Sequence, residues 1–255
     1  MPMIQADDGV RLYAESTGSG MPMLFIHEFA GDHRSWEPQV QYFSAALECI
    51  TYSARGYPPS DVPADPAAYS QQRAVDDAIS VLDALGARRA HVVGLSMGGF
   101  TALHLAMQHP DRLLSAVVAG AGTVRSPSGR TSSGASARPP RRRSSRRAPR
   151  GWPGATRPAR PSLYGLATEL AGIRVPVLIM TGDEDEGCLE PALMLKRAIP
   201  GSGLSVLPQT GHTANLEDPA AFNREVDRFL AAVDRGAWRQ RDPRSLSAST
   251  TGMTS

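Results

Sequence analysis

The chain has 255 residues, of which 41% are hydrophobic and 20% are charged, and its net charge is +2. This length allows one large domain with a full hydrophobic core, or two small ones. No apolar run approaches the ~18 residues that a membrane-spanning helix needs, which argues against a membrane partner. Only two cysteines occur, Cys49 and Cys188, and residues 1–8 lack the features of a secretion signal, so we expect a cytoplasmic protein.

The first half of the chain alternates between short apolar runs and helical patterns. Residues 70–85 carry an apolar stripe at helical spacing, which predicts an amphipathic helix. Such alternation is typical of an α/β fold in which helices cover both faces of a mostly parallel central sheet. Short apolar runs predict strands at residues 10–14, 23–27, 49–53, 91–94 and 114–119.

The pentapeptide G-L-S-M-G at residues 94–98 lies between a predicted strand and an apolar helical pattern at residues 100–107. A serine in a strand-to-helix turn has a strained backbone that presents its hydroxyl outward, and flanking glycines allow the close packing. The amide of Met97 then lies at a helix N-terminus, where negative charge is favoured. A chance match in a glycine-rich chain is the alternative, but this context favours Ser96 as a nucleophile.

Residues 124–161 break the alternation. They contain 11 arginines and no acidic residue; without these arginines the 27 basic residues of the chain fall to 16, against 25 acidic ones. So few large apolar side chains cannot offset the entropy of ordering, and we expect disorder here. The segment is either an Arg-rich arm for anionic partners or the product of a compensated reading-frame error. We favour the frame error, because GC-rich codons read out of frame yield this composition.

The second half returns to alternating elements, with a run rich in Arg, Ser and Thr at its end that predicts a disordered tail. Strands are expected at residues 175–180 and 204–207, and a closing helix at residues 219–233. We therefore divide the chain into four parts: a first part of the core (1–123), the Arg-rich segment (124–161), a second part of the core (162–235) and a tail (236–255).

A serine nucleophile needs a base within reach and a carboxylate that orients the base. Among the histidines His212 is best placed, because it follows the predicted strand at residues 204–207, and open α/β sheets have their sites at the carboxyl ends of strands. The acidic run at residues 183–186 follows another strand. We favour Asp185 for the carboxylate, since the order Ser, Asp, His is then met; Asp183 alternatively caps the turn.

A site for acyl transfer also needs two N–H donors for the oxyanion that develops. The amide of Met97 is the first candidate. The second donor of such sites follows an earlier strand, and here the turn at residues 27–31 offers the amide of Phe29. An ordinary tight turn is the alternative interpretation of residues 27–31.

Together these residues resemble the α/β-hydrolase superfamily over about residues 8–123 and 162–234. Within it the chain looks most like cofactor-free esterases, enol-lactonases, haloperoxidases and carbon–carbon-bond hydrolases. Glu28 departs from the family, which usually has Gly at that position, and a helical cap usually occupies the place of residues 124–161. The motifs that carry the resemblance lie in the family's order at residues 55–60, 94–100, 182–185 and 211–212.

The resemblance implies a serine hydrolase that cleaves a carboxylic ester, a lactone or a similar activated carbonyl. We expect Ser96 as nucleophile, His212 as base and Asp185 as its partner, with the amides of Phe29 and Met97 as oxyanion donors. A small ester-like substrate is expected, with no cofactor, no metal and no specific nucleic acid; the oligomeric state stays open. Two alternatives remain: a scaffold whose catalysis is impaired by loss of the cap, and salt-sensitive binding of anionic polymers through the Arg-rich segment.

Overall fold

A mostly parallel β-sheet forms the centre of the molecule. The computed structural model describes residues 3–122, 162–240 and 242. Its strands are β1 (Met3–Gln5), β2 (Arg11–Thr17), β3 (Met21–Ile26), β4 (Leu47–Tyr52), β5 (Ala90–Leu95), β6 (Leu113–Ala119), β7 (Val177–Gly182) and β8 (Ser202–Leu207). In the described ranges they form one eight-stranded sheet in the order β1-β2-β4-β3-β5-β6-β7-β8. Only the pairs of β2 with β1 and β4 are antiparallel.

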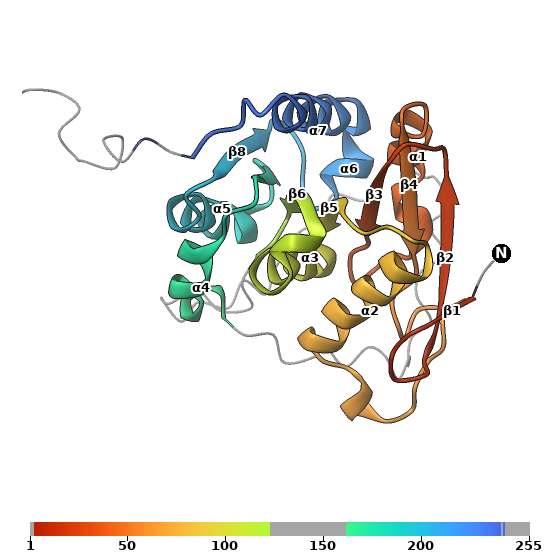
Figure 1. The fold of residues 1–255 in the computed structure, drawn as a ribbon. Coiled ribbons are helices and arrows are strands. Elements are labelled where there is room, and N and C mark those ends of the chain that lie inside the picture. Colours follow the sequence, from red (N-terminus) through yellow and green to blue (C-terminus); the bar gives the residue numbers. More distant parts are fainter. Residues whose placement is uncertain (1–2, 123–161, 241, 243–255) are drawn as a thin grey trace, which may run out of the picture.

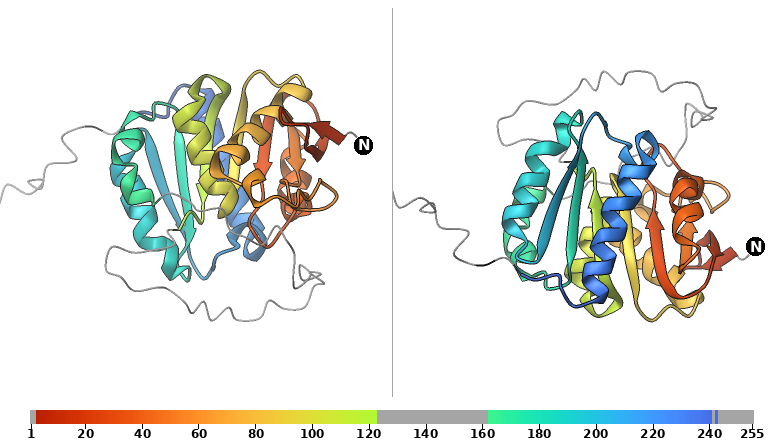
Figure 2. Two further views of the ribbon diagram at one scale, coloured as in Figure 1. Left: turned by 90° about the horizontal axis from the view of Figure 1, so that it is seen from below. Right: turned by 90° about the horizontal axis from the view of Figure 1, so that it is seen from above.

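Helices cover both faces of this sheet (Figures 1 and 2). The described α-helices are α1 (Glu37–Phe43), α2 (Gln71–Ala84), α3 (Met97–Gln108), α4 (Ala167–Gly172), α5 (Glu186–Ala198), α6 (Ala214–Glu217) and α7 (Pro219–Asp234). Helices α2 to α5 bury their apolar residues in one core cluster, and α1, α6 and α7 in a second cluster on the opposite face. The predicted α/β architecture is therefore confirmed.

Every predicted strand and helix overlaps an observed one, with shifts at the ends that have local causes. The strand expected at residues 175–180 begins only at Val177. Pro176 precedes it and has no N–H to donate to a neighbouring strand. Five of the described strands and α-helices were not predicted from the sequence: β1, α1, α4, α5 and α6. Of these, α5 is amphipathic and places Cys188, Ala192 and Leu195 in the interior.

The prediction of disorder at residues 124–161 lies outside the described residues, as does most of the predicted tail. The start of that tail, residues 236–240, is among the described residues. Trp238 packs edge-on against Phe229 with ring centroids 4.6 Å apart, and its indole N–H donates to the carbonyl of Gly201 at 2.8 Å. Burial of a large aromatic ring outweighs the polar composition around it. None of the described helices is long and apolar enough to cross a bilayer.

Candidate active site

Ser96 lies in the tight turn between β5 and α3. Its backbone has φ 54° and ψ −107°. Among the described non-glycine residues, only Gln209 also has a positive φ. Such strain is of the order of 1–3 kcal/mol and persists only where the surrounding structure enforces it. Here the Ser96 amide donates to the carbonyl of Ala119 at 2.8 Å, which ties the turn to the end of β6. The strained serine predicted from the sequence is present.

Close packing of the backbone explains why both flanking residues of the pentapeptide are glycines. A Cβ atom on Gly94 would lie 2.1 Å from the carbonyl oxygen of Gly98, and one on Gly98 would lie 1.9 Å from that of Ile26. Both distances are much shorter than a van der Waals contact. The first turn of α3 therefore packs directly against the ends of β5 and β3, and only glycine allows this approach.

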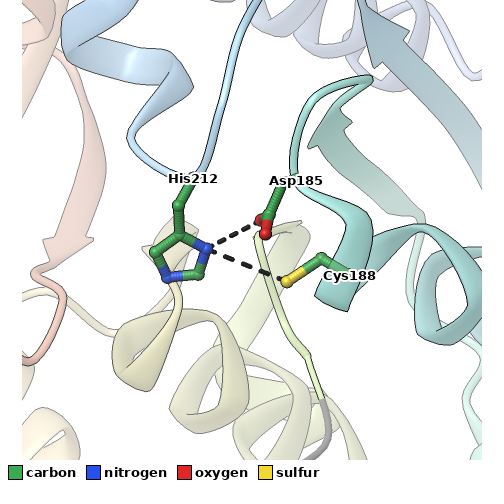
Figure 3. A group of neighbouring side chains, drawn as sticks. All are labelled: Asp185, Cys188 and His212. Atoms are coloured by element: carbon green, nitrogen blue, oxygen red, sulfur yellow. Dashed lines mark hydrogen bonds and ion pairs between the residues drawn. The ribbon is translucent and has the colours of Figure 1, made fainter. Parts of the chain in front are cut away.

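Asp185 and His212 come together from loops that follow neighbouring strands. Asp185 lies between β7 and α5, and His212 lies between β8 and α6. Oδ2 of Asp185 is 2.7 Å from Nδ1 of His212 (Figure 3). This hydrogen bond is the main reason why the pKa of His212 is raised above its usual value, against the opposing effect of desolvation. With Nδ1 turned to the carboxylate, Nε2 is left as the basic nitrogen of the ring.

Gly120 shows that His212 lies near the Ser96 turn, because it is close to both. A Cβ atom on Gly120 would lie 3.4 Å from Cε1 of His212, and the residue before Gly120 is Ala119, which accepts the Ser96 amide. Among the hydrogen bonds of the described residues, none joins the Ser96 hydroxyl to His212. In ligand-free sites such contacts are often long and tighten only when substrate is bound. The structure thus brings the three predicted residues to one edge of the sheet.

The competing carboxylate, Asp183, has a different role. Its Oδ1 accepts a hydrogen bond from the Thr210 amide at 3.3 Å, which links the loop after β7 to the loop after β8. Asp183 is therefore part of the framework that holds the two loops together. In this geometry Asp185 contacts His212.

The predicted oxyanion donors belong to two segments that lie side by side. Phe29 follows β3, and Met97 begins α3; a Cβ atom on Gly98 would lie within 2.9 Å of the His27 carbonyl oxygen, so the two segments touch. A cavity of about 50 Å³ lies beside them, and its lining includes the side chains of Phe29, Tyr57 and Met97.

The chain is similar to known proteins of one family. The family model described as alpha/beta hydrolase fold matches residues 21–151. A 2-hydroxymuconate semialdehyde hydrolase from Pseudomonas putida is 30% identical over 269 aligned positions, which cover 89% of this chain and 92% of that protein. The chain belongs to the α/β-hydrolase fold family. The family resemblance expected from the sequence is confirmed.

Other α/β hydrolases match over different lengths. 3-Oxoadipate enol-lactonase 1 from Acinetobacter baylyi is 36% identical over 97 residues, which are 38% of this chain and 35% of the enol-lactonase. The chain thus spans about a third of this relative and of several other curated ones. Among solved structures, Est816, described as an N-acyl homoserine lactone degrading enzyme, has a TM-score of 0.74 at 28% identity and covers 89% of this chain and 100% of its own. These three relatives are, by name, a hydrolase, a lactonase and a lactone-degrading enzyme.

His27 is a residue of this α/β hydrolase to which no sequence pattern assigned a role. It is fully buried, and the amide of Ala54 donates to its Nε2 at 3.0 Å. The ring proton is therefore on Nδ1, which donates to the carbonyl of Glu28 at 2.7 Å. Desolvation holds the pKa of His27 below its usual value and keeps the ring neutral. His27 thus fixes the loop that carries Phe29, a role visible only once β3 and β4 are paired.

Glu28, the departure from the family pattern, is buried with 7% of its surface exposed. Its Oε1 accepts from the hydroxyl of Ser35 at 3.1 Å, whereas Oε2 has no partner in the described part of the chain. Gly31 makes room for it, since a Cβ atom there would lie 2.1 Å from Oε1. The negative charge of Glu28 also contributes, after Asp185, to raising the pKa of His212. The unusual residue therefore changes the electrostatics of the site.

Two other histidines make side-chain contacts of their own. Nδ1 of His33 lies 2.9 Å from the Ser53 hydroxyl. His91 is buried with Nδ1 2.8 Å from the Ser115 hydroxyl. Among the described residues, the one group of side chains with the composition of a metal site consists of Asp185, Cys188 and His212.

Proposed function

We propose that this chain is a serine hydrolase that cleaves a carboxylic ester, a lactone or a similar activated carbonyl. The observation that carries the proposal is the 2.7 Å contact between Asp185 and His212, at the edge of the sheet where Ser96 occupies its strained turn. An orienting carboxylate, a base and a serine in this arrangement are the parts that nucleophilic acyl transfer requires.

In the proposed reaction, Nε2 of His212 takes the proton from the Ser96 hydroxyl while Oγ attacks the carbonyl carbon. Asp185 holds the imidazole in the required tautomer and stabilises the imidazolium that forms. The oxyanion of the tetrahedral intermediate accepts hydrogen bonds from the amides of Phe29 and Met97. His212 then protonates the leaving oxygen, and a water that it deprotonates releases the acyl group from Ser96.

The substrate class is supported by the names of relatives. One curated relative is called an enol-lactonase, and one similar structure belongs to an enzyme that degrades N-acyl homoserine lactones. Both names describe cleavage of a lactone, which is a cyclic ester. We therefore assign lactones and simple esters as the first substrates to test.

The experiment compares Ser96→Ala with the wild type on 4-nitrophenyl acetate and on an N-acyl homoserine lactone. Loss of the nucleophile should lower kcat at least a thousandfold, to about the rate that the oxyanion donors and substrate binding support without Ser96. Ser80→Ala is the matched control, because the Ser80 hydroxyl lies on α2 and donates to the Asp76 carbonyl. A fluorophosphonate probe should label one serine in the wild type, and mass spectrometry should locate the label at Ser96. Activity of Ser96→Ala equal to that of Ser80→Ala would reject the proposal.

The alternatives of an impaired scaffold and of an anion-binding arm both depend on residues 124–161, which lie outside the described residues. The same assay addresses the first of them. Soluble protein with measurable hydrolysis favours an enzyme, whereas aggregation or a folded protein without hydrolysis favours a scaffold that has lost catalysis.

A further inference from the structure

A free thiol lies beside the proposed catalytic base. Cys188 is in the first turn of α5, three residues after Asp185, so that both side chains lie on one face of the helix start. Its Sγ is 3.8 Å from Nδ1 of His212 and donates to the Gly120 carbonyl at 3.4 Å. One oxygen of Asp185, the sulfur of Cys188 and one nitrogen of His212 all lie within 4.8 Å of one another (Figure 3).

We propose that Asp185, Cys188 and His212 form a zinc site, and that Zn²⁺ bound there inhibits the enzyme reversibly. The binding stands on the geometry of the three side chains alone, whereas the inhibition rests on the proposed function. Carboxylate oxygen, thiolate sulfur and imidazole nitrogen are the ligand types that zinc prefers in proteins.

The separations of the three donor atoms can be compared with those around a tetrahedral zinc ion. Zinc binds sulfur at about 2.3 Å and nitrogen or oxygen at about 2.0–2.2 Å, so its ligand atoms lie roughly 3.3–3.6 Å apart. The separation of 3.8 Å between Sγ and Nδ1 is close to this range. The 2.7 Å between Oδ2 and Nδ1 must lengthen by at least about 0.6 Å. The third separation, between an oxygen of Asp185 and Sγ, is within 4.8 Å. The His212 side chain is 45% exposed, which gives access for the ion and for a water as fourth ligand.

Two glycines leave space for this cluster. A Cβ atom on Gly122 would lie 2.8 Å from Sγ of Cys188, and one on Gly120 would lie 3.5 Å from Nδ1 of His212. The loop after β6 thus lies close to the thiol and the imidazole, and glycine at these two positions leaves room for both side chains. The donor atoms come from two segments: Asp185 and Cys188 from the start of α5 after β7, and His212 from the loop after β8.

Zinc binding changes the protonation of two side chains. The Cys188 thiol loses its proton to solvent as the Zn–S bond forms, so one proton is released for each ion. His212 offers the lone pair of Nδ1 only when its proton is on Nε2. In that tautomer the ring cannot take the proton of Ser96, and hydrolysis stops until the ion leaves.

Isothermal titration calorimetry of the untagged full-length chain with Zn²⁺ tests the binding. The wild type should bind one ion with release of one proton, measured from the dependence of the heat on the buffer. Cys188→Ala should lose at least about tenfold in affinity. Cys49→Ala is the matched control, because Cys49 is also a buried free thiol but lies in β4, and it should bind like the wild type. Equal affinity of both variants, or no binding by the wild type, would overturn the site.

Two further measurements keep the inference testable if Cys188→Ala does not fold. Co²⁺ bound to the wild type through a thiolate should give a sulfur-to-metal charge-transfer absorption in the near ultraviolet, and absence of this band overturns the site. Zn²⁺ should inhibit ester hydrolysis by the wild type and by Cys49→Ala, and a chelator should restore it. Hydrolysis that continues with zinc bound overturns the inhibition. Zinc binding in a protein without any hydrolysis supports the site and rejects the proposed function instead.

Discussion

Glu217 accepts hydrogen bonds from the backbone on both sides of His212. Its Oε2 accepts from the Gly211 amide at 2.8 Å, and its Oε1 accepts from the Thr213 amide at 3.0 Å and from the Thr213 hydroxyl at 2.9 Å. The carboxylate therefore holds the loop in which His212 lies, although it does not touch the imidazole ring. Glu217 is a positioning residue of the site.

Substitution of Glu217 should affect kcat more than KM. Glu217→Ala frees the backbone on either side of the base, and a misplacement of about 1 Å lowers the rate by about a hundredfold. Glu217→Gln keeps one strong acceptor and should retain intermediate activity. Steady-state kinetics on 4-nitrophenyl acetate measures both variants, with the exposed Asp227→Ala on α7 as control. A change in KM without a change in kcat would contradict a positioning role.

The pH dependence of kcat/KM should report the raised pKa of His212. The base must be neutral to act, so activity should fall as the pH drops through a pKa above 6.5, the ordinary value for histidine. The negative charge of Glu28 contributes to this rise. Glu28→Gln should therefore move the acid limb of the profile to lower pH. A limb that does not move in Glu28→Gln would show that this buried carboxylate has no electrostatic effect on the base.

The buried ion pair between Arg55 and Asp77 should be needed for folding. Two guanidinium nitrogens of Arg55 lie 2.7 and 2.6 Å from the two oxygens of Asp77, and both side chains are at least 95% buried. Arg55→Met leaves the carboxylate of Asp77 unpaired in the interior and should lower the free energy of unfolding by about 3–5 kcal/mol. Urea denaturation measures this loss. Arg11→Met, which breaks the exposed pair with Asp61, should leave the urea midpoint nearly unchanged.

Recovery of the midpoint in the double variant Arg55→Met/Asp77→Leu would confirm that the loss comes from the orphaned charge. A double variant as unstable as Arg55→Met would instead assign the loss to packing or to the second partner of Arg55, Asp8.

His104 should make the protein sensitive to acid. Both of its ring nitrogens are buried, and neither has a partner within the described ranges; desolvation lowers its pKa below 6.5. The unfolded chain then binds more protons than the folded one, so stability is full above pH 6.5 and falls as the pH drops toward the folded-state pKa. His104→Leu should remove part of this loss and leave stability at neutral pH equal or higher, because it removes an unsatisfied polar group.

Urea midpoints at pH 7.5 and 5 test this expectation. An identical loss of stability with acid in the wild type and in His104→Leu would place the sensitivity elsewhere, for example at His27 or His91, whose pKa values burial also lowers.

Local patterns in the sequence sufficed to predict the α/β architecture, the turn at Ser96 and the loops that carry Asp185 and His212. Strands and helices follow from apolar periodicity, and the pentapeptide at residues 94–98 has the glycines that a tight strand-to-helix turn requires. These features depend on neighbours along the sequence, so composition and spacing reveal them. Composition did not reveal the contact of Trp238 with Phe229, because the residues around this aromatic ring are polar.

Only the tertiary structure decided which carboxylate meets His212, what holds the loops and where the thiol lies. Asp183 and Asp185 are two residues apart and chemically alike, and the packing of β7 beside β8 directs the first to the Thr210 amide and the second to the imidazole. Glu217 on α6 holds the loop of this base, and Cys188 on α5 lies beside its ring. Such contacts depend on how distant segments pack across the sheet, which local periodicity does not encode.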